Sequence, residues 1–111
     1  MIEQTIIAHL NDCLAVPVSG QVPEDPPATF VTVEKTGVGV KNHIFSAQLA
    51  IQSWAESQAK AAELNEAVKV AMADAVQLDE ISRCRLDSDF NDPDTTRKFN
   101  RYQAVFSVVH F

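Results

Sequence analysis

The sequence has few cysteines, no long apolar run and fewer basic than acidic residues. Its two cysteines, Cys13 and Cys84, fall on apolar faces without a CxxC spacing. We therefore expect both to be reduced core residues, and we predict neither a disulfide nor a metal site. No apolar run approaches the length of a membrane span. The opening MIEQTIIAHL has no basic stretch and no small-residue cleavage site, so we expect no export signal.

The charge balance is acidic. Lys and Arg number 9 against 15 Asp and Glu, which gives a formal net charge of −6. Proteins that bind nucleic acid derive much of their affinity from neutralising phosphates. The balance therefore argues against specific nucleic-acid binding.

Length and composition predict one domain, residues 1–111. With 46% apolar and 22% charged residues, the chain has an ordinary globular composition. A domain of this size buries about two thirds of the surface that its unfolded chain exposes. We therefore expect a hydrophobic core that needs no disulfide and no metal.

The stretch from Phe45 to Val76 contains two apolar periods joined by almost no linker. Its first part alternates, which predicts a strand with one buried face and places Trp54 on the polar side. From Ser57 onward the period becomes three to four residues, which predicts an amphipathic helix of about five turns with Ser57 as its N-cap. The alternating residues are Phe45, Ala47, Leu49 and Ile51, and the helical ones are Ala61, Leu64, Val68, Ala71 or Met72, and Ala75.

The other elements follow from similar patterns. A spacing of four from Ile2 to Leu14 predicts an N-terminal helix that ends before Pro17. The next stretch, up to Phe30, holds four prolines and predicts an extended edge segment followed by a stiff loop. Further strands are predicted at Thr29–Thr36, Asn42–Trp54, Leu78–Asp87 and Arg101–Phe111.

Two polar loops are predicted to connect these strands. Gly37, Val38 and Gly39 lie between two strands, so we interpret them as a hairpin tip; a phosphate-binding turn would need a following helix. The stretch from Ser88 to Asn100 is first acidic and then basic. The order of elements predicts an α+β fold, a mostly antiparallel sheet with two helices packed on one face.

The last predicted strand is apolar on both faces. Because both helices are expected on one side of the sheet, its second face needs another cover, and a partner subunit is the simplest one. One face carries Tyr102, Ala104, Phe106 and Val108, and the other carries Val105, Val109 and Phe111.

No set of residues has the spacing that a reaction would need. Asp87, Asp89 and Asn91 begin like a calcium loop, but Asp92 stands where the sharp turn needs glycine. Lys98 stands where the loop needs a bidentate glutamate. The histidines are far apart in sequence, and no Ser-His-Asp or Cys-His arrangement is apparent. We therefore expect no catalytic residue, no metal and no cofactor.

Three motifs together resemble those of a known family. GQVPEDPPATFVTVEKTG, FSAQLAIQSWAES and DEISRCRLDSDF with RYQAVFSV are similar to small tail-completion proteins of tailed bacteriophages and prophages of low-GC Gram-positive bacteria, of the tail terminator type. The resemblance covers nearly the whole chain and includes no catalytic fingerprint. It implies an α+β domain that caps the head-proximal end of the tail tube as a ring, commonly a hexamer. It also implies assembly in the bacterial cytoplasm, docking to the tail tube protein and to neck or head-closure proteins, and a channel through which DNA passes.

The resemblance suggests roles for particular residues. Side-to-side contacts in a ring would bury apolar area. Contacts with neighbouring rings would use polar loops that become ordered on binding. The candidates for the subunit interface are Trp54, Val105, Val109 and Phe111. The candidates for the loop contacts are Gly37, Val38, Gly39, Asp89, Asp92, Arg97, Lys98 and Arg101.

Two other functions stay open at this point. A head-closure or neck protein of the same assembly would have much the same sequence features. A cytoplasmic ligand-binding or enzymatic α+β domain, perhaps dimeric, would need a pocket with convergent polar groups between helix and sheet.

Overall fold

The chain folds as an α+β domain, which confirms the predicted fold class. The computed structural model describes residues 2–41, 44–91 and 99–110. In chain order the elements are α1 (Ile2–Cys13), β1 (Val18–Ser19), β2 (Phe30–Lys41), β3 (Ile44–Ala55), α2 (Gln58–Ala73), the 3-10 helix η1 (Asp74–Gln77), β4 (Ile81–Asn91) and β5 (Asn100–His110). No helix of the described ranges has the length and apolar content needed to cross a membrane.

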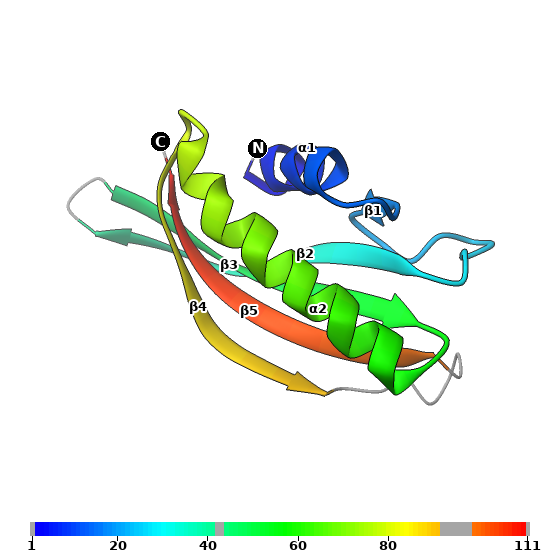
Figure 1. Ribbon diagram of the computed structural model, residues 1–111. Coiled ribbons are helices and arrows are strands. Elements are labelled where there is room, and N and C mark those ends of the chain that lie inside the picture. The colour runs from blue at the N-terminus through cyan, green and yellow to red at the C-terminus, as the bar shows by residue number, and fades with distance from the viewer. Residues whose placement is uncertain (1, 42–43, 92–98, 111) are drawn as a thin grey trace.

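The five strands form one twisted sheet in the order β1-β2-β3-β5-β4 (Figure 1). Every pairing is antiparallel except that of β1, which runs parallel to β2 over two residue pairs. The central strand β3 pairs with β5 along its whole length, from Phe45 opposite His110 to Ala55 opposite Asn100. The predicted edge segment after α1 is therefore present as the short strand β1.

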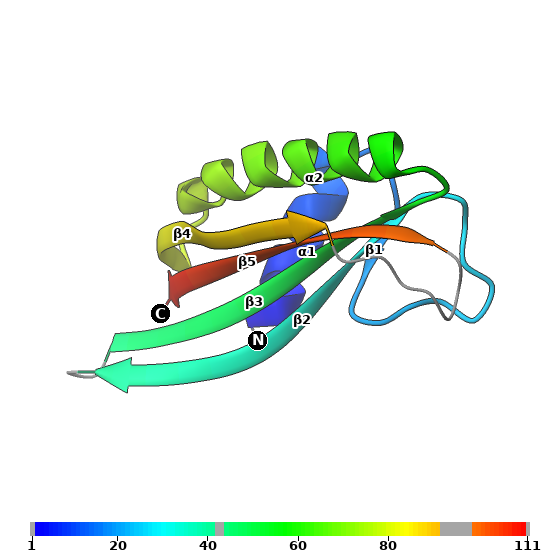
Figure 2. The same ribbon diagram turned by 90° about the horizontal axis from the view of Figure 1, so that it is seen from below.

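Both helices cover the same face of the sheet, as predicted. Figure 2 shows α2 stretched along the sheet with α1 on the same side. Ser57 caps α2 as expected, because its hydroxyl oxygen accepts a hydrogen bond of 3.2 Å from the amide of Lys60. The apolar stripes of both helices meet the alternating residues of the strands in one core. Its fully buried members include Ile6, Leu10, Leu49, Ile51, Val68, Met72 and Val108.

A second, smaller apolar cluster lies on the opposite face, at one end of the sheet. Trp54 stacks on Phe30 with 5.3 Å between ring centroids, and Phe99 meets both rings edge-on. The guanidinium of Arg101 lies 4.9 Å from the centroid of the Trp54 ring. Trp54 is only 2% exposed, and its indole N–H donates to the hydroxyl of Thr32. The interface prediction therefore does not extend to Trp54, because its surface is already buried within its own chain.

The hairpin tip is not where the sequence predicts it. Gly37, Val38 and Gly39 are part of β2, which continues to Lys41, and the chain turns only after that residue. The register shifts at Thr36 and the ladder then resumes, so the glycines follow a β-bulge and do not form a turn. At Gly39 a Cβ atom would lie 2.9 Å from the Oγ of Ser46, so a larger residue there would require the serine side chain to move.

The strand β4 is longer than predicted, and it extends to Asn91. Asp89, which was assigned to the loop of residues 88–100, is a strand residue paired with Ala104. Arg101 is likewise part of β5. Asp92, Arg97, Lys98 and Phe111, which were predicted as contact residues, lie outside the described residues.

Candidate assembly interface

The sheet has one face without helices, which we call the open face. In the part of the chain that the structure describes, no helix lies on this side of the sheet (Figure 2). Its middle strands present Gln48 and Gln52 from β3 and Val105, Ser107 and Val109 from β5. The predicted interface residues Val105 and Val109 lie here and are half-buried. The structure thus places both valines on the same face, without a cover from the helices.

Polar side chains connect the strands across the open face. The hydroxyl of Thr32 donates to the side-chain oxygen of Gln52 at 2.6 Å, and the amide nitrogen of Gln52 donates to Gln103 at 3.0 Å. This row spans β2, β3 and β5 and ends at the indole of Trp54 through Thr32. Cross-strand pairs of this kind stabilise the sheet without covering it.

A charged group occupies the same face near β4. Ser107 donates its hydroxyl proton to the carboxylate of Asp87, which also accepts from Arg85 at 3.0 Å. The hydrogen bond from Ser107, aided by Arg85, lowers the pKa of Asp87 below its ordinary value of 3.8. By the strand register, Glu34 of β2 and Arg83 of β4 also lie on this face. The open face therefore carries charges of both signs.

Both edges of the sheet are open over long stretches. β1 pairs only with Val31 and Thr32 of β2. Among the described residues, no strand pairs with the outer edge of β2 beyond Thr32, or with the outer edge of β4. Unpaired edges present rows of N–H and C=O groups that can pair with another chain.

The end of the β2–β3 hairpin extends beyond the rest of the domain. We call residues 37–41 and 44–45 the arm (Figures 1 and 2). Val38 and Val40 are 71% and 63% exposed, and Ile44 and Phe45 are more than half exposed. Val38, Val40 and Phe45 share the helix side of the sheet according to the register, and Ile44 lies on the open face. A run of apolar side chains without cover is unusual for a monomer and indicates a contact surface.

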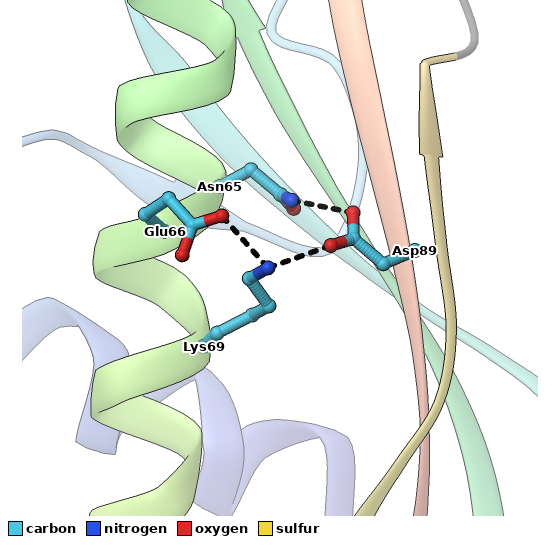
Figure 3. Close-up of polar contacts among 4 residues, drawn as sticks. All are labelled: Asn65, Glu66, Lys69 and Asp89. Atoms are coloured by element: carbon cyan, nitrogen blue, oxygen red, sulfur yellow. Dashed lines mark hydrogen bonds and ion pairs between the residues drawn. The ribbon is translucent and has the colours of Figure 1, made fainter.

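A polar cluster holds α2 to the edge strand β4 (Figure 3). The buried amide of Asn65 donates to one carboxylate oxygen of Asp89 at 2.7 Å, and the ammonium of Lys69 donates to the other at 2.6 Å. Glu66 pairs with the same ammonium at 2.8 Å. The hydrogen bonds from Lys69 to Asp89 and Glu66 raise the pKa of Lys69 above 10.5. A lysine that acts as a general base needs a lowered pKa, so this cluster is arranged for packing and not for proton transfer.

The first residues of the apparent calcium loop do not converge. Asp87 contacts Ser107 on the open face, whereas Asp89 contacts α2 on the helix face. The cause is a register shift between Leu86 and Ser88, which places Asp87 and Asp89 on opposite faces, whereas residues two apart in a regular strand share one face. No group of three or more metal-binding side chains gathers within the described ranges.

Both cysteines are free. Cys13 is exposed, so the prediction that it is a core residue is wrong. Cys84 is half-buried, and burial raises the pKa of its thiol to about 11. Cys13 lies 3.7 Å from Nε2 of His9, a contact that the spacing of four along a helix could have predicted. Nε2 is only 2.8 Å from the carbonyl oxygen of Ala71 and donates its proton there. The other ring nitrogen, Nδ1, is then the one that can accept a proton, and it lies 4.0 Å from the Cys13 sulfur, which is a long contact for proton transfer.

A groove separates the end of α1 from the outer side of α2. It measures about 520 Å³ and is lined by Cys13, Leu14, Ala67, Val70, Ala71, Ala73 and Asp74. Most of this lining is apolar, and Val70 is 72% exposed. The α2 side of the groove carries three alanines, whose side chains are small. A partner can therefore come close to the helix backbone. The groove lies between the helices and not between helix and sheet, and its polar groups do not converge on one point as they do in a catalytic pocket.

Sequence reasoning missed this groove, and it predicted the arm only in part, through Gly37, Val38 and Gly39. The apolar character of Val40, Ile44 and Phe45 was visible, but the alternation alone assigned Phe45 to the core. The strand lengths carry the missing signal, because two strands of twelve residues extend past the helices that cover them. The groove has no comparable signal, since it depends on the angle between α1 and α2.

Comparisons with known proteins find a likeness at the level of structure and none at the level of sequence. No protein-family model matches the chain, and no curated protein matches it. Among the solved structures that match is a chain from the virion of a native gene transfer agent particle. The two chains are 13% identical, the match covers 95% of this chain and 83% of the other, and the TM-score is 0.46.

Proposed function

We propose that this chain is a structural protein of a bacteriophage or prophage virion, which completes the tail tube at its head-proximal end by assembling into a ring. It works through assembly and docking and not through catalysis. The observation that carries the proposal is the amount of unpaired surface on so small a domain. As far as the structure describes the chain, one sheet presents an open face, two edges that are unpaired over most of their length, and an exposed apolar arm.

These surfaces suit a subunit with several neighbours. The two unpaired edges lie on opposite sides of the sheet, at β2 and at β4, so one copy can contact another on each side. Contacts between different surfaces of identical subunits generate closed rings when the rotation closes. The arm lengthens the molecule, which measures 43 × 24 × 24 Å, and extends its reach toward a neighbour.

The sequence motifs direct this general assembly role toward the tail. GQVPEDPPATFVTVEKTG forms the loop and the first half of β2, and FSAQLAIQSWAES forms β3 and the cap of α2. The third motif forms β4 and β5. The resemblance to tail-completion proteins therefore rests on the sheet that carries the unpaired surfaces, and we propose the same role for this chain.

The absence of an activated group in the polar clusters supports the non-catalytic part of the proposal. In the described residues, hydrogen bonds to Asp89 and Glu66 favour the charged form of Lys69, and the free nitrogen of His9 lies 4.0 Å from the sulfur of Cys13. A ligand-binding domain would need polar groups that converge in a pocket, and the groove between α1 and α2 is mainly apolar.

Electron microscopy of tails tests the proposed location. Purified headless tails from a phage or prophage that encodes this chain are incubated with the tagged protein, and the label is located along each tube. We expect the label at one end only, the end that joins the head, and we expect tube growth to stop there. Label along the whole tube, or on heads in place of tails, would contradict the proposed role, and label on the head vertex would favour the neck protein.

A further inference from the structure

We propose that the arm of one copy docks in the groove between α1 and α2 of the next copy. The proposal rests on the ring assembly proposed above and names one contact that would build it. It joins two exposed apolar surfaces that are not part of the core or of the aromatic cluster.

The arm is ready for such a contact before binding. Its two strands pair from Gly37 opposite Gln48 to Lys41 opposite Ile44, and the hydroxyl of Thr36 donates to the carbonyl of Gln48 at 3.3 Å. Phe45 also rests against His110, with 6.4 Å between the ring centroids. A surface that is already ordered loses little conformational entropy on binding.

The groove has the matching chemistry. Val70 and Leu14 form its walls and the alanines of α2 its low side, so valine and phenyl side chains would replace water on apolar surface. A volume of about 520 Å³ exceeds what one side chain fills and suits several from one ribbon. Because the arm and the groove are different surfaces, the contact can repeat head-to-tail from copy to copy around a ring.

Charge complementarity identifies the occupant as a second copy. The stretch GVGVKNHIFSAQ, residues 37–48, contains Lys41 and no acidic residue, although the chain as a whole has a net charge of −6. Asp74 is part of the groove lining, and the exposed Asp12 directly precedes the lining residue Cys13 in the sequence. The last turn of α2 contains no basic residue, so its negative helix end is not compensated within that turn. An apolar arm whose sequence has no acidic residue therefore fits, on a neighbouring copy, an apolar groove that contains Asp74.

Matched valine-to-threonine changes test the contact. Threonine keeps the β-branched shape, so the double variant Val38→Thr/Val40→Thr retains the strand but loses apolar surface. Val70→Thr makes the same change inside the groove, and Val76→Thr makes it on an exposed valine outside the groove lining. Assembly is followed by light scattering at rising concentration, alone and with headless tails, and folding is checked by thermal unfolding. We expect the arm variant and Val70→Thr to raise the concentration needed for assembly by about tenfold or more, and Val76→Thr to leave it unchanged.

A crosslink locates the contact directly. Cys13 lines the groove and is exposed, so Val40→Cys in a Cys84→Ala background should form a disulfide with Cys13 of the next copy under mild oxidation. Phe90→Cys, on the edge strand β4, is the control at a similarly exposed site and should give far less linked product. Fragments that contain residue 40 joined to residue 13 are then identified by mass spectrometry.

The outcomes separate this inference from the proposed function. If the wild type assembles while the arm variant assembles equally well and no link joins residues 40 and 13, the arm contact is wrong and the ring remains. If residue 40 links to a different partner position, the groove is not its site and the inference fails. If the wild type assembles neither alone nor on tails, both proposals fail together.

Discussion

At the scale of residues, Trp54 shows how a polar-side position becomes part of the fold. It lies on the open face, where it stacks on Phe30, is flanked by Phe99 and Arg101, and donates to Thr32. These contacts cover the open face at the end of the sheet where β2 begins and β3 ends. The indole thus stabilises the monomer and leaves the rest of the open face free for partners.

Replacement of Trp54 by alanine should destabilise the monomer. Truncation of a buried tryptophan leaves a cavity and typically costs about 3–5 kcal/mol of the free energy of unfolding. Urea denaturation followed by circular dichroism measures this loss. Phe90→Ala serves as the control, because Phe90 is largely exposed and its loss should cost far less. Equal losses for the two variants would show that the aromatic cluster does not stabilise the fold.

Ionised Asp87 should contribute to stability in a pH-dependent way. Its pKa in the folded chain is lowered from 3.8, first by the hydrogen bond from Ser107 and further by Arg85. The stabilisation is therefore present above pH 3.8 and is lost as the pH falls through the lowered pKa. We expect Asp87→Asn to be less stable than the wild type at pH 7 and the difference to vanish in acid.

The cause of this shift can be tested separately. Ser107→Ala removes the largest contribution, so the pKa of Asp87 should rise toward 3.8 in an NMR titration of its carboxyl carbon. Gln103→Ala changes a neighbouring polar residue on the same strand and face and should leave that pKa in place. A pKa that does not respond to Ser107→Ala would contradict the assigned cause.

At the scale of elements, Asp89 links α2 to the edge strand. It accepts hydrogen bonds from both Asn65 and Lys69, and Asn65 is almost fully buried. Asp89→Ala would leave the buried amide of Asn65 without its acceptor, at a cost of about 1–3 kcal/mol. We also expect faster hydrogen exchange of the β4 amides. Glu66→Ala is the matched control, since Glu66 is largely exposed and touches only the lysine of this cluster. A β4 that exchanges no faster in Asp89→Ala than in Glu66→Ala would disprove the link.

The element pattern was predictable wherever one face alone is buried. Alternation identified β3, the spacing of three to four identified α1 and α2, and the hydroxyl of Ser57 identified the start of α2. The same patterns do not reveal register shifts. The bulge at Thr36 lets β2 continue through two glycines that otherwise indicate a turn, and the shift after Leu86 extends β4 and separates Asp87 from Asp89.

The candidate assembly surface was predictable only in part, because exposure of its residues depends on tertiary contacts. The two-faced pattern of the last strand correctly placed Val105 and Val109 on a face without helices. Burial of Trp54 depends on Phe99 and on the segment after β1, which are distant in sequence. Exposure of the arm depends on where the helices end, and the groove depends on how α1 crosses α2. Such tertiary relations have no local signature.

At the scale of the whole molecule, the fold combines a well-buried core with strand edges and apolar side chains that stay exposed. The helices complete one face of the sheet, and the aromatic cluster completes one end of the other. Among the described residues, the outer edge of β4, most of the outer edge of β2, the centre of the open face and the apolar arm have no partner. A domain of this design has much to gain from binding copies of itself, and several weak contacts become stable together once a ring closes.

The solution mass tests this account most directly, measured by light scattering after size exclusion, with and without headless tails. We predict that the mass rises to a fixed multiple of the 12.2 kDa monomer and stays there, either in solution or on the tube ends, because a closed ring has no free interface left. A chain that remains monomeric or dimeric and ignores the tails, or a mass that grows without limit, would contradict the assembly of a ring.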